Sequence, residues 1–157
     1  MIPRPATLAD VDALVRVINL AYLVEADMFH GTRTTDADVH DRLVRPNAVF
    51  LLVRDAAAEV LVGSIYVETR ADRGYFGMLA VDPACQGRGL GRTLVRAAED
   101  HCRAAGSVAL DLDVVDLRRE LTSFYGSLGY AVVGESPYAH PEQTKRAVRL
   151  IRMTRAL

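Results

Sequence analysis

The sequence predicts an α+β fold in which helices cover both faces of one mixed, mostly antiparallel sheet. Two observations carry this prediction. Three consecutive runs of apolar and β-branched residues in the middle of the chain are typical of an antiparallel meander. On either side of the meander the spacing of apolar residues switches between helical and strand-like, which adds crossover helices. The 157 residues suffice for one hydrophobic core, so we expect a single domain over residues 1–157.

The chain begins with a predicted edge strand and a predicted helix. Residues 2–5 are flanked by proline, which cannot donate a hydrogen bond within a sheet and is therefore typical of an edge. Thr7 and Asp10 have the spacing of a capping box. An apolar stripe at helical spacing follows from Leu8 to Tyr22, so this helix is expected to cover one face of the sheet.

The remaining elements follow from the same rules of periodicity and termination. Thr35 is placed to cap a second helix over residues 36–44, and Gly106 is placed to end a third helix over residues 89–105. The strands of the meander are expected at residues 48–53, 60–69 and 74–82. After the third helix, the pattern predicts a strand at 108–115, a helix at 121–128, and strands at 130–133 and 147–153 that flank a polar loop at 134–146.

Composition excludes several classes of function. The 19 Lys and Arg residues are balanced by 20 Asp and Glu residues, which leaves no excess positive charge for binding nucleic acid. The N-terminal residues do not resemble a signal peptide, and no apolar run approaches the ~20 residues of a membrane span. We therefore expect a cytoplasmic protein without nucleic-acid or membrane partners. Neither Cys85 and Cys102 nor the four histidines have metal-ligand spacing, so no metal is expected.

The most informative segment runs from Leu79 to Leu94 and consists of a strand, a short turn, a glycine-rich run and a helix. Glycines at positions 87, 89 and 91 permit unusual backbone angles, so successive N–H groups can converge on an anion. The N-terminus of the following helix favours negative charge as well. We interpret this segment as a phosphate cradle, although a turn that only packs a helix on a strand would use the same glycines.

Two common phosphate motifs fit this segment less well. A P-loop needs Gly-Lys-Ser/Thr at the start of the helix, whereas Gly91 is followed by Arg92 and Thr93. A dinucleotide fingerprint needs a glycine where Arg92 stands, although Asp111 lies near the distance expected of a ribose-binding acid. Nucleotide hydrolysis is therefore disfavoured, and a nicotinamide-dependent oxidoreductase stays open as an alternative.

Two motifs resemble those of a known family. The segment from Gln86 to Gly91, preceded by Leu-Ala-Val-Asp-Pro, resembles the Gln/Arg-x-x-Gly-x-Gly/Ala signature of the GNAT superfamily of acyl-CoA-dependent N-acyltransferases. Phe124-Tyr125-x-x-Leu-Gly-Tyr130 resembles the second signature of that family, and the order of predicted elements is similar over essentially the whole chain. The resemblance implies a sheet that is splayed at its middle and acetyl-CoA as the cosubstrate.

The resemblance also implies which residues hold acetyl-CoA. The pantetheine arm would pair, like an added strand, with the backbone of Leu79, Ala80 and Val81, where this strand splays from its parallel neighbour. The pyrophosphate would lie on the glycine loop. The residues of that loop are Gln86, Gly87, Arg88, Gly89, Leu90, Gly91 and Arg92.

The same resemblance assigns roles in acyl transfer, which in this family proceeds by direct attack of the amine within a ternary complex. Tyr125 is the expected general acid for the departing thiolate, although it also lies on an apolar stripe with Leu121 and Leu128, as a core residue would. The backbone N–H of Val81, or of Leu79, is expected to stabilise the oxyanion. The general base stays open, with three candidates near strand ends: Glu68, Asp113 and Asp116.

The acceptor is expected to be a primary amine of a small molecule, a peptide N-terminus or a protein lysine. In this fold it would bind between residues 25–35 and residues 135–146. Four acidic residues there are candidates to attract a cationic amine: Glu25, Asp27, Glu135 and Glu142. A non-catalytic acyl-CoA sensor is the alternative function, and no feature of the sequence decides for or against a homodimer.

Overall fold

The sheet has seven strands in the order β1-β2-β3-β4-β5-β7-β6 in the computed structural model, which describes all 157 residues. Its neighbouring strands are antiparallel except for β4 and β5, which are parallel. This confirms the prediction of a mixed, mostly antiparallel sheet. The strands are β1 (Arg4–Pro5), β2 (Ala48–Asp55), β3 (Val60–Arg70), β4 (Arg73–Val81), β5 (Ala109–Val115), β6 (Ala131–Pro137) and β7 (Arg149–Ala156).

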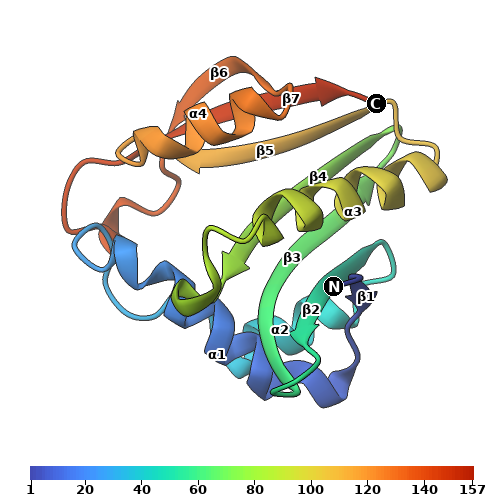
Figure 1. Cartoon of the computed structure of the whole chain (residues 1–157). Coiled ribbons are helices and arrows are strands. Elements are labelled where there is room, and N and C mark those ends of the chain that lie inside the picture. The colour runs from blue at the N-terminus through green and yellow to red at the C-terminus, as the bar shows by residue number, and fades with distance from the viewer.

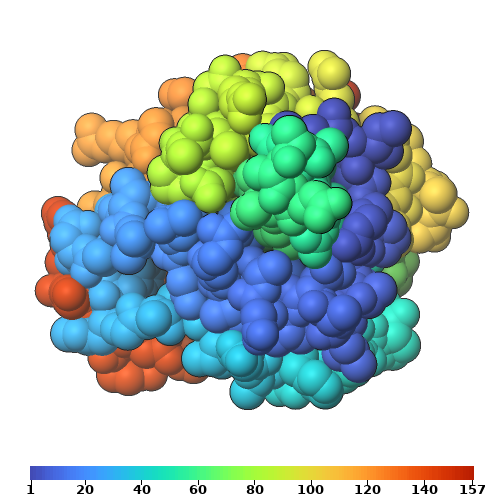
Figure 2. Space-filling view, turned by 60° about the horizontal axis from the view of Figure 1, so that its bottom comes forward, coloured from blue at the N-terminus to red at the C-terminus, as the bar shows by residue number.

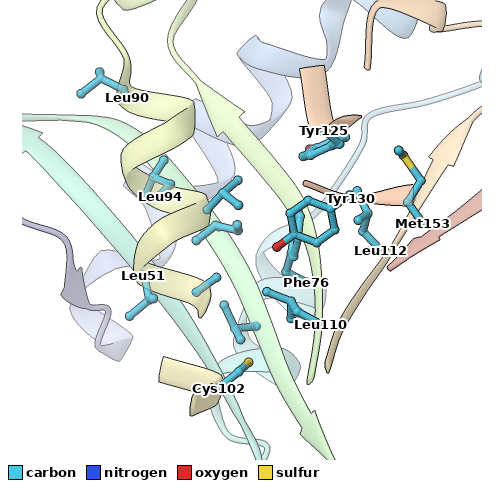
Figure 3. Close-up of a cluster of buried hydrophobic side chains, with 14 of the residues drawn as sticks. Leu51, Phe76, Leu90, Leu94, Cys102, Leu110, Leu112, Tyr125, Tyr130 and Met153 are labelled. Carbon is cyan, nitrogen blue, oxygen red and sulfur yellow. The ribbon is translucent and has the colours of Figure 1, made fainter. Parts of the chain in front are cut away.

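Helices cover both faces of this sheet, as predicted (Figure 1). They are α1 (Val11–Ala21), α2 (Asp36–Leu43), α3 (Leu90–Ala104) and α4 (Arg119–Ser127), with short 3-10 turns at Leu8–Asp10 (η1), Tyr22–Glu25 (η2), Pro83–Cys85 (η3) and Pro141–Gln143 (η4). One buried cluster joins α1 and α2 to the sheet, and a second joins α3 and α4 to the opposite face (Figure 3). No helix combines the length and the apolar character that a bilayer crossing requires.

The predicted helix starts are confirmed by their hydrogen bonds. The backbone N–H of Thr7 donates to the Asp10 carboxylate at 2.9 Å, and the hydroxyl of Thr35 accepts from the backbone N–H of Asp38 at 3.2 Å. The expected loop at 134–146 is shorter than predicted, because β6 continues to Pro137. β6 pairs only with β7, and a proline at the end of such an edge strand removes no ladder hydrogen bond.

The sheet opens between its two parallel strands. β4 and β5 are paired at only three positions, which are Arg73↔Ala109, Gly74↔Leu110 and Tyr75↔Asp111. Beyond Tyr75, β4 remains paired with β3 alone, while β5 continues along β7. The splay implied by the family resemblance is therefore present, and it leaves a gap between the C-terminal ends of β4 and β5.

A β-bulge in β4 changes which side chains face each side of the sheet. Met78 and Leu79 both lie opposite Ile65, and Met78 has a φ of 51°, an unusual value for a residue other than glycine. Phe76 packs in the cluster under α3, whereas Met78 and Ala80 pack in the cluster under α1. Strict alternation would have placed these three side chains on one face of the sheet. The bulge therefore moves the side chains of Met78 and Ala80 to the opposite face from Phe76.

Candidate active site

The loop at residues 82–89 joins β4 to α3 and is shaped by its own hydrogen bonds. The carboxylate of Asp82 accepts from the backbone N–H of Ala84 at 3.0 Å, which begins the turn η3. The side-chain amide of Gln86 donates to the backbone carbonyl of Val81 at 3.4 Å. These contacts bring the loop back against the end of β4.

The glycine-rich part of the loop presents unpaired backbone donors. Gly87 and Gly89 both have a φ of 78°, and a Cβ on either would meet no atom within 4 Å, so glycine is required there for backbone conformation rather than for space. None of the backbone N–H groups from Gly87 to Arg92 makes a well-formed hydrogen bond within the chain. Because α3 has no acidic residue in its first turn, these donors lie at the positive end of an uncompensated helix.

Arginine side chains add positive charge beside these donors. Arg88 and Arg92 are both exposed at the start of α3. Further along the helix, in contrast, Glu99 neutralises Arg155 at 2.7 Å and approaches Arg103 at 3.8 Å. The beginning of α3 is therefore the part of this face that is best suited to an anion.

The end of β4 presents unpaired backbone groups to the gap. The backbone N–H of Asp82 donates to Val62 of β3 at 2.8 Å. Backbone N–H groups alternate between the two edges of a strand, so those of Leu79 and Val81 point toward β5, which has already separated. The side chain of Ala80 is fully buried under α1. Residues 79–81 thus offer a strand edge whose N–H groups are free and whose Val81 carbonyl is met only by the Gln86 side chain, as an extended, amide-bearing ligand would require.

A cavity of about 450 Å³ lies at the gap. Leu79 and Tyr125 line it from the two sides of the opening, and the connection between α1 and α2 closes it farther out. The polar side chains that line it include Tyr22, Glu25, Arg33, Arg42, Tyr75, Asp113, Tyr125 and Tyr138.

Tyr125 belongs both to the core and to the cavity. Its ring packs 5.7 Å from Phe76 and 6.1 Å from Tyr130, measured between centroids, and the residue is 5% exposed (Figure 3). Its hydroxyl is not among the enclosed polar atoms and makes no hydrogen bond within the chain. Burial raises the pKa of Tyr125, so the phenol keeps its proton at neutral pH.

Two further tyrosines were not anticipated from the sequence. Tyr22 and Tyr75 also line the cavity, and neither hydroxyl has a hydrogen-bond partner in the chain. The hydroxyls of Tyr66 and Tyr130, in contrast, donate to Glu68 and Glu99. In the sequence Tyr22 ends an apolar helical stripe and Tyr75 lies in a strand, so no local signal marks either as a site residue.

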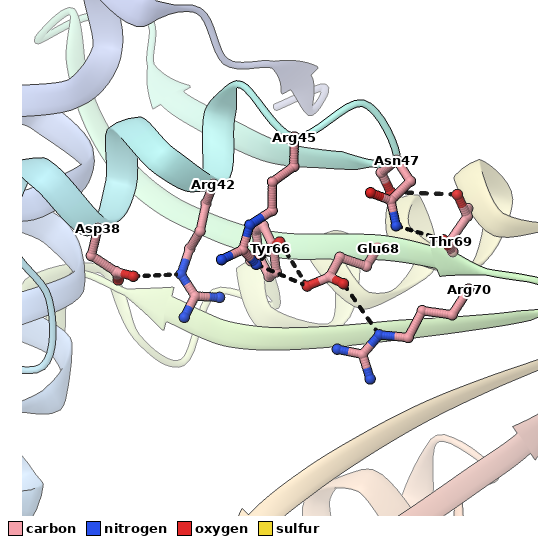
Figure 4. Close-up of polar contacts among 8 residues, drawn as sticks. All are labelled: Asp38, Arg42, Arg45, Asn47, Tyr66, Glu68, Thr69 and Arg70. Atoms are coloured by element: carbon pink, nitrogen blue, oxygen red, sulfur yellow. Dashed lines mark hydrogen bonds and ion pairs between the residues drawn. The ribbon is translucent and has the colours of Figure 1, made fainter.

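One base candidate, Glu68, lies in a polar network outside the cavity (Figure 4). It accepts hydrogen bonds from the Tyr66 hydroxyl at 2.7 Å and from Arg70 at 3.2 Å. Burial alone would raise the pKa of Glu68, but these hydrogen bonds outweigh burial and hold that pKa below its usual value. Glu68 is therefore a weak base, and it lies outside the cavity in which the acetyl group is expected.

Of the three base candidates, Asp113 alone lines the cavity. It accepts two hydrogen bonds from Arg152 on the neighbouring strand, at 2.7 and 3.0 Å. Asp116, in contrast, accepts from the backbone N–H of Arg149 and fixes the turn after β5.

The four acidic residues expected to attract a cationic amine are all engaged with basic residues. Glu25 pairs with Arg118 at 3.0 Å, Asp27 with Arg146 at 3.3 Å, Glu142 with His140 at 3.3 Å, and Glu135 with Arg149. The negative charges of Glu25, Asp27 and Glu135 are therefore balanced by arginines, whereas His140 balances Glu142 only when it is protonated. The expectation of an acidic acceptor site is not supported by this arrangement.

Residues 16–130 match the sequence model of the acetyltransferase (GNAT) family. The chain belongs to the GNAT family. The mycothiol acetyltransferase of Propionibacterium freudenreichii is 32% identical over 131 residues, which cover 79% of this chain and 41% of that protein. This chain thus spans about two-fifths of that relative. The IAA acetyltransferase of Azospirillum brasilense is 29% identical over 128 residues, which cover 81% of this chain and 83% of that protein.

Solved structures share the fold of this GNAT chain. The yncA protein of Salmonella typhimurium, solved with its cofactor acetyl-CoA, has a TM-score of 0.78 at 22% identity, covering 100% of this chain and 94% of that one. The residues present in this chain fit the same ligand chemically. Diphosphate needs clustered donors, which Gly87 to Arg92 supply, and an amide-bearing arm needs a free strand edge, which Leu79 and Val81 supply.

Proposed function

We propose that this protein is an acyl-CoA-dependent N-acetyltransferase that moves an acetyl group from acetyl-CoA to a primary amine by direct attack within a ternary complex. One observation carries the proposal. The free edge of β4 leads directly into the loop with the unpaired donors of residues 87–92, and Leu79 on that edge lines the same cavity as the unpartnered hydroxyl of Tyr125. We further propose that residues 1–157 act as a single acetyltransferase domain.

Three parts of the chain bind or position different parts of acetyl-CoA. The backbone N–H groups of Gly87 to Arg92 bind the pyrophosphate, and Arg88 and Arg92 add charge to it. Gln86 holds the loop against the end of β4 through its bond to Val81. The free edge at Leu79 and Val81 pairs with the amides of the pantetheine arm, so that the acetyl group lies at the inner end of the cavity beside Tyr125.

The acetyl thioester supplies an activated carbonyl carbon, and the protein residues position it and manage charge and protons. The neutral amine attacks this carbon, so a C–N bond forms and the C–S bond breaks. The backbone N–H of Val81, or that of Leu79, faces the carbonyl oxygen and stabilises its developing negative charge. Tyr125 donates its proton to the departing thiolate and regains one from the attacking nitrogen, which balances the transfer.

The test is release of free CoA thiol from acetyl-CoA over a panel of amines. Tyr125→Phe should lower kcat by ~10²–10⁴ while CoA binding and the melting temperature stay unchanged, because only a hydroxyl without intramolecular partners is removed. Tyr66→Phe is the matched control, since that hydroxyl lies outside the cavity and bonds to Glu68; it should keep its activity.

Two outcomes would contradict the proposal. Stabilisation of the wild-type protein by CoA without turnover on any amine would favour a non-catalytic acyl-CoA sensor. Stabilisation by a nicotinamide dinucleotide but not by CoA would favour an oxidoreductase. Wild-type turnover in Tyr125→Phe would remove only the assignment of the general acid.

A further inference from the structure

The charges that line the cavity are paired, with one exception. Its carboxylates Glu25 and Asp113 are each held by an arginine, at 3.0 and 2.7 Å. Its cation Arg42 is held by Asp38 at 3.0 Å. Arg33 also lines the cavity, but no carboxylate lies within ion-pair distance of its guanidinium. The acceptor end of the site therefore carries an uncompensated positive charge.

Arg33 is exposed, and it belongs to the lining of the cavity. The Arg33 guanidinium lies over the ring of Tyr22, 5.1 Å from its centroid. The next residue, Thr34, is tied to α1 by two hydrogen bonds with the side chain of Asn19, at 2.9 and 3.1 Å. The backbone beside Arg33 is thus fixed, and the guanidinium shares the cavity with the unpartnered hydroxyls of Tyr22 and Tyr75.

A strap closes the same end of the cavity. Residues 26–30 are joined to residues 143–146 by backbone hydrogen bonds from His30 to Gln143 and from Lys145 to Met28, each at 2.8 Å. The two segments lie against each other at the molecular surface (Figure 2). Because this strap connects both acceptor loops and contributes to the lining, it forms one wall of the cavity and leaves less room for a polypeptide than two separate loops would.

We infer that the amine acceptor is a small molecule that also carries a carboxylate, as a free α-amino acid does. Its carboxylate binds Arg33 and the hydroxyls of Tyr22 and Tyr75, and its amino group points toward Tyr125. Burial raises the pKa of both Tyr22 and Tyr75, so both phenols are protonated donors at neutral pH. This inference rests on the proposed acetyltransferase function and specifies its substrate class.

The test compares free L-amino acids with their carboxamides in the thiol-release assay. The two members of each pair differ in the carboxylate, and the carboxamide has the larger fraction of neutral amine at neutral pH. Wild-type kcat/KM should nevertheless be roughly 10–100-fold higher for the best amino acid, because an arginine and two hydroxyls bind its carboxylate. Arg33→Gln should remove this preference, mainly by raising KM, and should leave the rate with the carboxamide unchanged.

Arg45→Gln is the control, because Arg45 is another partly exposed arginine that lies outside the cavity. It should keep the wild-type preference. The inference is overturned if carboxamides or peptides with free N-termini react as well as amino acids, or if Arg33→Gln slows both members of a pair equally. Absence of thiol release with every amine would instead overturn the proposed function, and the inference with it.

Discussion

Replacing Gly89 by alanine tests whether acetyl-CoA requires the loop conformation seen here. Gly89 has a φ of 78° and space for a Cβ, so Gly89→Ala keeps the backbone donor and adds only conformational strain. A left-handed backbone costs a residue other than glycine roughly 1–2 kcal/mol. The CoA complex requires the left-handed conformation, so the variant carries the full strain when CoA is bound. The loss in unfolding free energy of the free protein and the loss in CoA-binding free energy should therefore add up to this strain.

We expect most of the loss from Gly89→Ala to appear in binding. The N–H groups of the loop make no well-formed hydrogen bonds in the free protein, so only the two bonds from Thr93 to the Gly89 carbonyl oppose relaxation of the loop before CoA arrives. The dissociation constant of CoA, measured by isothermal titration calorimetry, should then rise roughly 5–30-fold. Urea unfolding in the absence of CoA measures the part of the strain that appears as a loss in the unfolding free energy of the free protein.

Gly106→Ala provides a matched control at the opposite end of the same helix. Gly106 has a φ of 86° and equally free space, and the 15 residues of α3, a helix about 22 Å long, lie between the two glycines. Gly106→Ala should lower the unfolding free energy and leave the CoA dissociation constant unchanged. The reasoning is refuted if Gly89→Ala binds CoA as tightly as wild type, or if both variants weaken binding equally.

Two further predictions concern stability. Despite the opposing effect of burial, hydrogen bonds from Arg4, Thr7 and Arg54 lower the pKa of Asp10 from 3.8 to about 2. The ionised Asp10 carboxylate therefore stabilises the fold fully above pH ~4, and this stabilisation is lost as the pH falls toward 2. Asp10→Asn should lower the unfolding free energy, measured by urea titration, by about 2 kcal/mol at pH 7 and by progressively less between pH 4 and 2. A loss that does not change with pH would contradict this. A Cβ at Gly74 would lie 2.4 Å from the Cys102 sulfur, so Gly74→Ala should cost roughly 1–3 kcal/mol in thermal unfolding. Adding Cys102→Ala should cost less than the two single changes summed, whereas strict additivity would exclude the clash.

The parts of the site that depend on local rules could be predicted from the sequence. The glycine loop is predictable because the positive φ at Gly87 and Gly89 selects for glycine wherever the loop occurs. The helix starts are predictable because each depends on a hydrogen bond between residues three apart. The backbone N–H of Thr7 donates to the Asp10 carboxylate, and the Thr35 hydroxyl accepts from the backbone N–H of Asp38. The order of elements followed from periodicity, and only their ends shifted.

The parts that depend on long-range geometry could not be predicted. The bulge places Met78 in a left-handed conformation that its side chain does not favour, so no local signal announces it. Tyr22, Tyr75 and Tyr125 come from η2, β4 and α4 and meet only after folding. The pairing of Glu25 with Arg118 spans 93 residues and neutralises the negative charge expected of the acceptor site.

The short pairing between β4 and β5 explains why the proposed general acid is a core residue. With three paired positions, these strands hold the sheet together only at one end, so the opened end depends on side-chain packing. The ring of Tyr125 supplies part of that packing through Phe76 and Tyr130. Its hydroxyl is therefore fixed by the ring, without a hydrogen bond that would compete for its proton. Core packing therefore holds the Tyr125 ring rigidly and leaves its hydroxyl free to donate a proton. The same gap in the sheet exposes the edge of β4 for binding and requires the Tyr125 ring to fill the opening.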